Sequence, residues 1–464
     1  MNPLTGGLKF LFTTLSNALA ALAFFFVAGH FASPSFVGKA AMIQLVEVLT
    51  TSLFSILPRS LLIREIAHYY ASSQDYTKII YTSLTYPLLV SPFLLFLLFF
   101  PSYLWLSIPY FILFIYTNYQ ISLLTGLGKF TQVNVGNAIF TLMKWGLSII
   151  AIFYHSIILL ILIWTLGALV KAIYYQRFLP FKLYIDWKIF KEIATVGFPI
   201  YINGIIIFIS SQGDRVITAF LLGSYDLGVY QFVALVAVVP SMMISSFFSS
   251  LLPSSTYYHV KGRDIREMSS IALRIISLVS FPMAILGYAV SPLFISKLFP
   301  EYVSGIPAMQ LLVLSLTATM PLQLLYVFMV VAKVNYRPFI LIGSLSAIEV
   351  ISLSYVLIPR LEISGAAIAQ VVDVLLTSVL YLLFSVIQNV FQLGRREVSA
   401  LLLVALSFLS LLNWAVALIL VLLGFRLLGV VSTSEVKLVE ELAPQPLKRF
   451  TKVLYLVAGD RSVS

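Results

Sequence analysis

Apolar segments of about 20 residues recur along this chain from Leu8 to Gly429, and each is long enough to cross the hydrocarbon core of a bilayer. Within lipid, every backbone N–H and C=O must be bonded internally, so a spanning chain forms either helices or a closed barrel. Runs such as Phe93–Phe100 and Ala415–Leu423 are apolar at every position, whereas barrel strands alternate in polarity. The sequence therefore predicts an all-α, polytopic membrane protein.

The composition supports this fold class. Hydrophobic residues make up 60% of the chain and charged residues 10%, whereas roughly a quarter of a soluble globular protein is charged. The net charge of +11 would suggest a nucleic-acid partner for a soluble protein. Here we expect no nucleic acid, because membrane proteins concentrate Lys and Arg in their cytoplasmic loops. The chain has no cysteine, which excludes disulfides and thiol nucleophiles.

The order of apolar segments predicts a 12-helix core. With the N-terminus in the cytoplasm, the inner loops hold most Lys and Arg residues, and only Lys39, Lys297 and Arg360 lie outside. The apolar stretch Val398–Val431 is long for one further span and short for two, with Asn413 and Trp414 at its midpoint. The core spans are expected near residues 8–30, 38–63, 78–100, 103–125, 135–154, 156–178, 193–221, 228–253, 269–291, 303–331, 338–358 and 363–387.

The two halves of the chain resemble each other. Phe54–Pro58 matches Ser249–Pro253, and Tyr86-Pro87 matches Phe281-Pro282 at the same offset. Two parallel six-helix bundles are therefore predicted, an arrangement common in transporters with the substrate site between the halves. The expected domains are an N-terminal bundle with its linker at 1–192, a C-terminal bundle at 193–390, one or two additional spans at 391–431, and a cytoplasmic tail at 432–464.

A few polar side chains within the predicted spans are candidates for a functional cavity, because a charge inside the membrane usually faces water or a partner. Helical spacing places Gln44 with Glu47 and Gln370 with Asp373. Lys144 lies near the middle of its span, too deep to reach the surface easily. The alternative for each carboxyl group is a structural hydrogen bond between helices. A further stripe in the seventh span contains Asn203, Ser210, Asp214 and Thr218, with Arg215 adjacent.

Other charged residues receive different interpretations. Arg59, Lys171 and Arg274 lie within about two turns of the inner surface, where long cationic side chains are expected to extend toward water. Glu349 fits either a cavity wall or a helix–helix contact. No Gly-rich phosphate loop and no His-Glu-x-x-His motif occurs in the sequence, and the four histidines are scattered. We therefore predict no catalytic residues, no metal site and no cofactor.

Several short motifs resemble those of a known family. They are Gly197-Phe198-Pro199, Gln212-Gly213-Asp214-Arg215, Leu221-Leu222-Gly223, Leu227-Gly228-Val229-Tyr230, Leu298-Phe299-Pro300-Glu301-Tyr302 and the run from Ile363 to Ala369. Their order and spacing are similar to the oligosaccharide flippase and polysaccharide biosynthesis family. This is the Wzx-like branch of the multidrug/oligosaccharidyl-lipid/polysaccharide exporter superfamily, and the resemblance covers roughly residues 5–390.

The resemblance implies an alternating-access flippase in the plasma membrane. Its substrate would be an oligosaccharide linked to a polyprenyl pyrophosphate, and polysaccharide-assembly proteins are possible partners besides membrane lipid. Within that expectation the candidate residues have three roles. They are phosphate binding by Lys144 and Arg215, sugar binding by Asn203, Ser210, Gln44 and Gln370, and coupling to H⁺ or Na⁺ by Glu47, Asp214 and Asp373.

Three other functions remain open. A drug or cation exporter of the same superfamily would need a carboxylate-rich cavity, which Lys144 argues against. A scaffold of a polysaccharide-assembly complex would tolerate the loss of Lys144, Glu47 or Asp214. An enzyme acting on lipid-linked sugar would need an acidic catalytic pair, which the sequence does not show.

Overall fold

The computed structural model describes residues 3–239, 264–332 and 337–442, together with Gly262, Val334 and Tyr455, and gives only the backbone for 3–15, 322–323 and 438–442. Helices account for all regular structure in this described part. The chain divides into two compact units, Met1–Phe232 and Val233–Ser464. The predicted span near 228–253 and the tail lie partly outside the described residues, and the predicted repeat motif Ser249–Pro253 lies wholly outside them.

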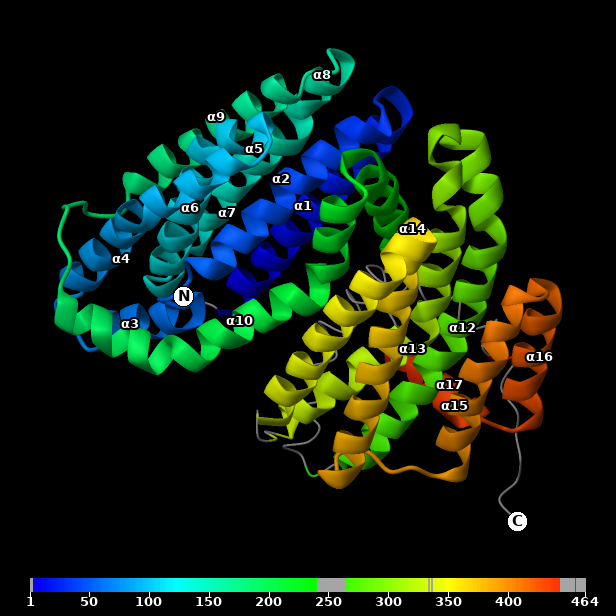
Figure 1. Ribbon diagram of the computed structural model, residues 1–464. Helices are drawn as coiled ribbons and strands as arrows, with labels where there is room; N and C mark the ends of the chain where they lie inside the picture. The colour runs from blue at the N-terminus through cyan, green and yellow to red at the C-terminus, as the bar shows by residue number, and fades with distance from the viewer. Residues whose placement is uncertain are drawn as a thin grey trace. The chain divides into compact units, whose positions relative to one another are not determined.

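The first unit contains long helices interrupted by short irregular segments (Figure 1). Its segments from α1 to α10 are α1 (Pro3–Phe31), α2 (Pro34–Leu53), α3 (Arg59–Ala71), α4 (Thr77–Val90), η1 (Ser91–Phe99), α5 (Ser102–Leu106), α6 (Ile108–Gly126), α7 (Phe130–Thr141), η2 (Leu142–Leu147), α8 (Ser148–Phe153), α9 (Ile157–Gln176) and α10 (Trp187–Leu221). A further apolar helix begins at Ser224.

Proline explains one break that the sequence prediction missed. The predicted span near 38–63 is two helices, because α2 ends at Leu53 and α3 begins at Arg59 after Pro58. Proline has no N–H to donate and clashes with the preceding turn, so it is favoured at a helix start and disfavoured in an interior. The break leaves Ser55 and neighbouring backbone groups outside a regular helix.

The helix that begins at Ser224 approaches α2 closely enough to exclude side chains between them. A Cβ atom added to Gly38 would lie 1.7 Å from the carbonyl oxygen of Ser224. One added to Gly228 would lie 1.8 Å from the carbonyl oxygen of Pro34. Glycine is therefore required at both positions. This contact fixes the start of the helix against α2.

The long helix α10 belongs to the first unit. It contacts α2, α3 and α4, and in Figure 1 it runs across the ends of the helices beside it. The division between units consequently falls after the predicted boundary at residues 192 and 193. The predicted boundary rests on the internal repeat in the sequence. The domain ranges expected from the sequence remain a prediction.

The second unit is a further helical bundle. Helices α12, α13 and α14 pack in sequence order, and α15 and α16 form a hairpin against α12. Its described segments are α12 (Ile265–Leu298), η3 (Pro300–Gly305), α13 (Ile306–Val331), α14 (Arg337–Ile387), α15 (Arg395–Ser407), η4 (Phe408–Leu411), α16 (Trp414–Leu427) and α17 (Thr433–Leu442). Helix α14 contains two arms that meet at Glu362, whose φ is 51°. These arms correspond to the predicted spans near 338–358 and 363–387.

The apolar stretch Val398–Val431 is a hairpin of two short helices. Asn413 caps α16 by accepting hydrogen bonds from the backbone N–H groups of Ala415 and Val416. Helices α15 and α16 have 13 and 14 residues, so each extends only about 20 Å at 1.5 Å per residue. Neither helix alone covers a hydrocarbon core of about 30 Å.

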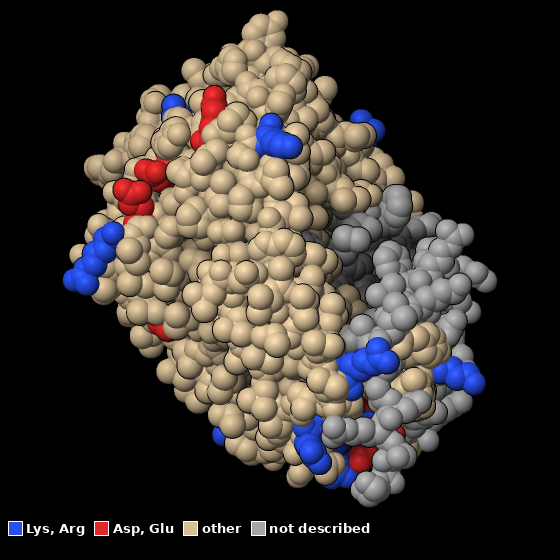
Figure 2. Space-filling model, turned by 90° about the vertical axis from the view of Figure 1, so that its right-hand side faces the viewer, with Lys and Arg blue, Asp and Glu red and all other residues tan. Residues whose placement is uncertain are grey.

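The described surface and helix lengths fit a membrane protein. Eight described helices are long and apolar enough to cross a bilayer. Large apolar side chains such as Phe93 and Phe198 are exposed, and Figure 2 shows broad areas of the described surface without Lys, Arg, Asp or Glu. Contiguous apolar surface of this extent is unfavourable in water and favourable in lipid. The chain is therefore an all-α, multi-pass membrane protein.

Candidate functional site

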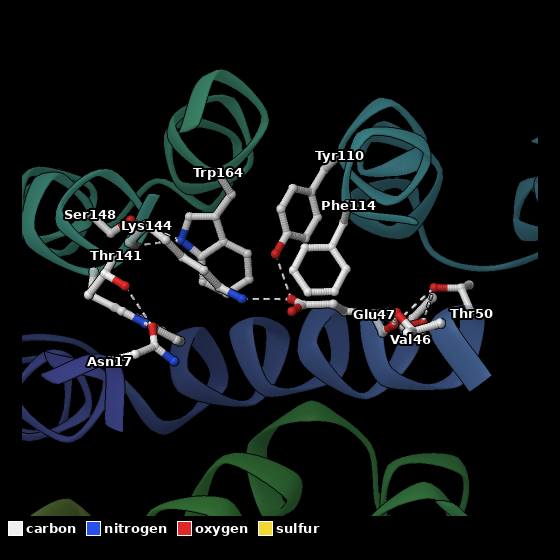
Figure 3. Close-up of polar contacts among 12 residues, drawn as sticks. Asn17, Val46, Glu47, Thr50, Tyr110, Phe114, Thr141, Lys144, Ser148 and Trp164 are labelled. Atoms are coloured by element: carbon white, nitrogen blue, oxygen red, sulfur yellow. Dashed lines mark hydrogen bonds and ion pairs between the residues drawn. The ribbon is translucent and has the colours of Figure 1, made fainter. Parts of the chain in front are cut away.

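A buried ion pair joins two distant parts of the first unit. The Nζ atom of Lys144 lies 2.7 Å from Oε2 of Glu47, across 97 positions of sequence. The two residues are 3% and 7% exposed. Because α2 carries Glu47 and η2 carries Lys144, the pair also connects these two elements (Figure 3). The sequence singled out both residues but did not predict that they are partners.

Aromatic residues complete the surroundings of the pair. The Tyr110 hydroxyl on α6 donates a hydrogen bond of 2.6 Å to the same Glu47 oxygen, so that oxygen accepts from two helices (Figure 3). The Lys144 ammonium also lies 4.7 Å from the Trp164 ring centroid and 4.9 Å from that of Trp145. Cations are attracted to aromatic faces, most strongly when both are desolvated. These contacts partly replace the water that Lys144 loses.

The backbone at Lys144 is π-helical. Residues Leu142–Leu147 form the π-helical segment η2 between α7 and α8. The indole N–H of Trp164 donates to the Lys144 carbonyl oxygen at 2.9 Å, and that of Trp145 donates to Oδ1 of Asn17 at 3.0 Å. A π turn widens the helix and is frequent at functional sites. Side chains from two other helices thus hold the segment that carries the cation.

A cavity of about 250 Å³ adjoins the ion pair. We call it the cationic cavity, because Arg59, Lys144 and Lys171 are among its lining residues. The others are Asn17, Glu47, Phe114, Asn118, Ile121, Asn137, Phe140, Thr141 and Trp145. Lys144 and Glu47 thus lie in the wall of a void.

The expectation that Lys171 extends to the inner surface is wrong. Its side chain is 3% exposed, and its ammonium lies 4.6 Å from the Phe140 ring centroid. The reason is local: Trp164, Gly167 and Lys171 follow one another at helical spacing on the buried face of α9. Arg59, at the start of α3, also lines the cavity, but it is exposed, so its expected extension toward water stays a prediction. The burial of Lys171 could have been predicted from its helical spacing with a buried aromatic residue and a buried glycine.

The charges of the cationic cavity do not balance. Three basic side chains, Arg59, Lys144 and Lys171, accompany one carboxylate, Glu47, which gives a formal excess of two positive charges when all four are ionised. Among the described residues, Lys144 forms an ion pair, and no ion pair involves Arg59 or Lys171. Unpaired cations within a membrane are costly, and an anionic ligand reduces that cost. The cavity is therefore suited to a group such as phosphate.

A second cavity, of about 460 Å³, lies where α2, α3 and α10 meet. We call it the hydroxyl pocket, because Thr51, Ser52, Ser55, Ser60 and Tyr201 contribute hydroxyl groups to its wall. Its other lining residues are Pro58, Arg59, Ile63, Ile200 and Gly204. Arg59 lines both cavities, so the two are neighbours.

Four of the predicted binding residues in the first unit line neither cavity. Gln44 is half-buried on α2, and Asn203, Ser210 and Arg215 lie on α10. Arg215 donates a hydrogen bond of 2.7 Å to Gln212, within its own helix. Their predicted roles in binding phosphate or sugar remain predictions.

Asp214 is in a different environment from Glu47. Its side chain is 2% exposed and accepts a hydrogen bond of 2.5 Å from the Tyr230 hydroxyl. Its backbone carbonyl accepts from Thr218. Asp214 therefore connects α10 to the helix that begins at Ser224, and it lines neither cavity. Its predicted coupling role is untested by this geometry.

The candidates of the second unit lie on α14. Asp373 is 6% exposed, and Gln370 is half-buried one turn before it. Glu349, on the other arm of α14, lies close enough to Asp373 for the two carboxyl groups to interact electrostatically. The sequence pattern predicted polar side chains here but not this proximity. Among the residues that the structure describes, no group of three or more His, Asp or Glu side chains is placed to hold a metal ion.

The fold and the cavities define a class of protein. The chain is a multi-pass helical membrane protein with a cavity lined by three cationic side chains inside one helical unit. A family model described as "Polysaccharide biosynthesis protein" matches residues 110–302. The matched range includes Lys144, Lys171 and Asp214. This agrees with the family resemblance seen in the sequence motifs.

Solved structures of transporters have the same fold. The structure titled "Lipid II flippase MurJ, inward closed conformation" matches with a TM-score of 0.68 and 13% identity, over 89% of this chain and 97% of that one. An inward-facing multidrug resistance MATE family transporter of the MOP superfamily matches with a TM-score of 0.62 and 14% identity, over 80% and 94%. At these identities the likeness shows the fold alone. No curated protein sequence matches the chain.

Proposed function

We propose that this protein is a flippase that translocates a polyprenyl-(pyro)phosphate-linked oligosaccharide across the plasma membrane by alternating access. The observation that carries the proposal is the cationic cavity, where three cations face one carboxylate. A phosphate or pyrophosphate group would supply the missing negative charge. The match to a polysaccharide biosynthesis family and the flippase-like fold support a lipid-linked saccharide as the substrate class.

The remaining roles belong to the same proposal. Lys144, Lys171 and Arg59 bind the phosphate, and the lipid tail stays in the bilayer. Glu47, Asp214 and Asp373 couple transport to H⁺ or Na⁺. The N-terminus is cytoplasmic, and polysaccharide-assembly proteins receive the product. The protein acts as a transporter and leaves its substrate chemically unchanged.

Reconstitution in vesicles tests the proposal. A fluorescent polyprenyl-pyrophosphate-linked saccharide is placed in the membrane, and a membrane-impermeant quencher reports how much of it reaches the outer leaflet. We expect the protein to make the protected fraction accessible, and Lys144→Ala or Lys171→Met to slow this about tenfold, because each removes a charged contact to phosphate. Ser211→Ala is the control, since its hydroxyl donates to the Ile207 and Phe208 carbonyls of its own helix.

Two outcomes would contradict the proposal. Protein-containing vesicles could match protein-free vesicles, or the Lys variants could move the probe as fast as the unmodified protein. Unchanged surface glycan in cells that carry Lys144→Ala would favour the scaffold function instead.

The likeness to multidrug transporters supports one alternative function. An exporter of cationic drugs would hold a cation in its cavity, where the excess positive charge of Arg59, Lys144 and Lys171 would repel it. In the same vesicles, under an imposed H⁺ or Na⁺ gradient, we therefore expect no movement of ethidium. Movement of ethidium without movement of the saccharide probe would favour the exporter.

A further inference from the structure

The hydroxyl pocket is not explained by phosphate binding. An ionised phosphate group only accepts hydrogen bonds, so it needs donors around it. The polar side chains of this pocket are five hydroxyl residues and Arg59, and a hydroxyl oxygen can also act as an acceptor. Its volume of about 460 Å³ lies within the range of ordinary ligand pockets, roughly 300–1,000 Å³. The question is which ligand such a wall selects.

Three of the five hydroxyl hydrogens of the pocket wall are committed to the backbone. Thr51 donates to the Glu47 carbonyl oxygen at 2.8 Å, and Ser55 donates to that of Thr51 at 2.5 Å. Tyr201, from α10, donates to the Leu53 carbonyl oxygen at 3.2 Å. Each of these three hydroxyl oxygens therefore offers lone pairs and no hydrogen to a ligand. The wall thus presents three acceptors on a largely apolar surface, beside the hydroxyls of Ser52 and Ser60 and the guanidinium of Arg59.

The break between α2 and α3 explains this arrangement. The last carbonyl groups of a helix have no partner within the helix, and here α2 ends at Leu53 before Pro58. Ser55 and Tyr201 satisfy two of these carbonyls, those of Thr51 and Leu53. The hydrogen bonds that satisfy the helix end thus use the hydrogens of Ser55 and Tyr201, both of which line the pocket.

Three acceptors on an apolar surface favour a ligand that has both hydrogen-bond donors and an apolar face. Sugar hydroxyls can donate as well as accept, while Pro58, Ile63 and Ile200 provide apolar surface for the C–H face of a sugar ring. A lipid tail would leave the acceptors without partners, and phosphate would meet them with further acceptors. Buried polar groups without partners cost free energy, so both of these ligands are disfavoured.

Arg59 connects this pocket to the cationic cavity, because it lines both. We infer that the hydroxyl pocket is the subsite for the sugar attached directly to the phosphate, with Arg59 at the sugar–phosphate junction. This inference rests on the proposed function and adds to it the place of the first sugar. That place is on α2, α3 and α10 of the first unit, and it does not involve Asn203, Ser210 or Gln370.

Binding measurements on the full chain in nanodiscs test the inference with two kinds of probe. One is farnesyl pyrophosphate, and the other is the same pyrophosphate carrying a single glucose or N-acetylglucosamine. We expect at least one sugar probe to bind more tightly than farnesyl pyrophosphate. The double variant Ser55→Ala with Tyr201→Phe removes two acceptors. It should weaken the binding of that sugar probe by roughly tenfold or more, while the affinity for farnesyl pyrophosphate changes less than about twofold.

Gly204→Leu is a second variant, which fills part of the pocket and leaves its hydroxyl groups unchanged. A Cβ atom at Gly204 meets no atom within 4 Å, so a side chain there can enter the pocket without displacing the helices. Gly204→Leu should weaken the binding of the sugar probe and leave the binding of farnesyl pyrophosphate unchanged. Ser211→Ala on the same helix is the matched control, and both probes should bind it normally.

The outcomes separate this inference from the proposed function. Two results would contradict the assignment of the sugar subsite and leave the phosphate site unaffected. In the first, farnesyl pyrophosphate binds but no sugar probe binds more tightly. In the second, the pocket variants weaken the binding of both probes equally. If neither probe binds the unmodified protein, the proposed function fails, and the subsite fails with it.

Discussion

Lys144 and Glu47 show how much depends on a single pair of side chains. Each is almost fully buried, and each is the other's ion-pair partner. A buried pair contributes little net stability compared with apolar residues of the same size, yet the loss of one partner leaves an uncompensated charge. Stability and function should therefore respond differently to changes here.

A double-mutant cycle measures this coupling. Lys144→Met should destabilise the protein by about 3–5 kcal/mol, because it leaves the Glu47 carboxylate buried beside Tyr110 alone. Lys144→Met combined with Glu47→Leu should be close to the unmodified protein in thermal stability. Thermal unfolding in detergent measures both. If the double variant were as unstable as the sum of the two single variants, the ion pair would not be coupled as described.

At the scale of elements, close helix contacts and irregular segments position the cavities. The π-helical η2 carries Lys144, and the break before α3 places Arg59 where the two cavities meet. Both features interrupt segments that the sequence predicted to be continuous spans. Packing of η2 against α1 and α9, and of α3 against α6 and α10, holds them in place.

Replacing glycine by alanine should have opposite effects on stability at two positions of the first unit. Gly38→Ala should destabilise by about 1–3 kcal/mol or more, because its Cβ would overlap the Ser224 carbonyl oxygen. Gly204→Ala should stabilise by about 0.5–1 kcal/mol, because its Cβ meets open space and alanine favours a helix. Thermal unfolding of both variants checks the contact. Equal effects would mean that α2 and the helix beginning at Ser224 are not in close contact.

In the second unit, Arg274 holds two helix starts together. Expected at the inner surface, it is instead 8% exposed on α12, and it pairs with Glu397 of α15 and Glu435 of α17. Glu397 also accepts from the Gly394 N–H, and Glu435 accepts from the Ser432 N–H. One guanidinium thus compensates two carboxylates that cap neighbouring helices.

We expect Arg274→Met to release α17, because both carboxylates would lose their buried cation. Trypsin should then cut after Lys437 several-fold faster than in the unmodified protein, as judged by the rate at which the C-terminal fragment appears. Arg396→Ala is the control, since Arg396 is 3.9 Å from Glu435 and its side chain is 36% exposed. Equal cleavage rates for unmodified protein and Arg274→Met would show that other contacts hold α17.

At the scale of the whole molecule, the transmembrane orientation is the main prediction still to be tested. The distribution of Lys and Arg places the N-terminus in the cytoplasm. The chain has no cysteine, so a single introduced cysteine can be labelled without background. Gln74 and Tyr154 are exposed, and they are predicted to lie on opposite sides of the membrane.

A membrane-impermeant maleimide applied to intact cells should label Tyr154→Cys and spare Gln74→Cys. After the cells are opened, both should react. Labelling of Gln74→Cys alone in intact cells would reverse the orientation, and labelling of both would contradict the predicted number of spans between them.

The sequence by itself determined the fold class and the set of buried charges worth examining. Apolar segments such as Ile157–Gln176 can only be satisfied as helices in lipid, and a lysine at the depth of Lys144 needs a partner. These conclusions follow from local composition, because the solvent around each segment imposes them. Glu47, Asp214 and Asp373 were found in the same way, and the structure buries all three.

Only the tertiary structure decided which of these charges meet. Glu47 and Lys144 are 97 positions apart, and Arg59 and Lys171 reach the same cavity from two further helices. Helical periodicity assigns each residue to a face of its own helix but does not determine which helix that face contacts. The packing of helices with one another, with contacts as close as that of Gly38 with Ser224, determines that choice.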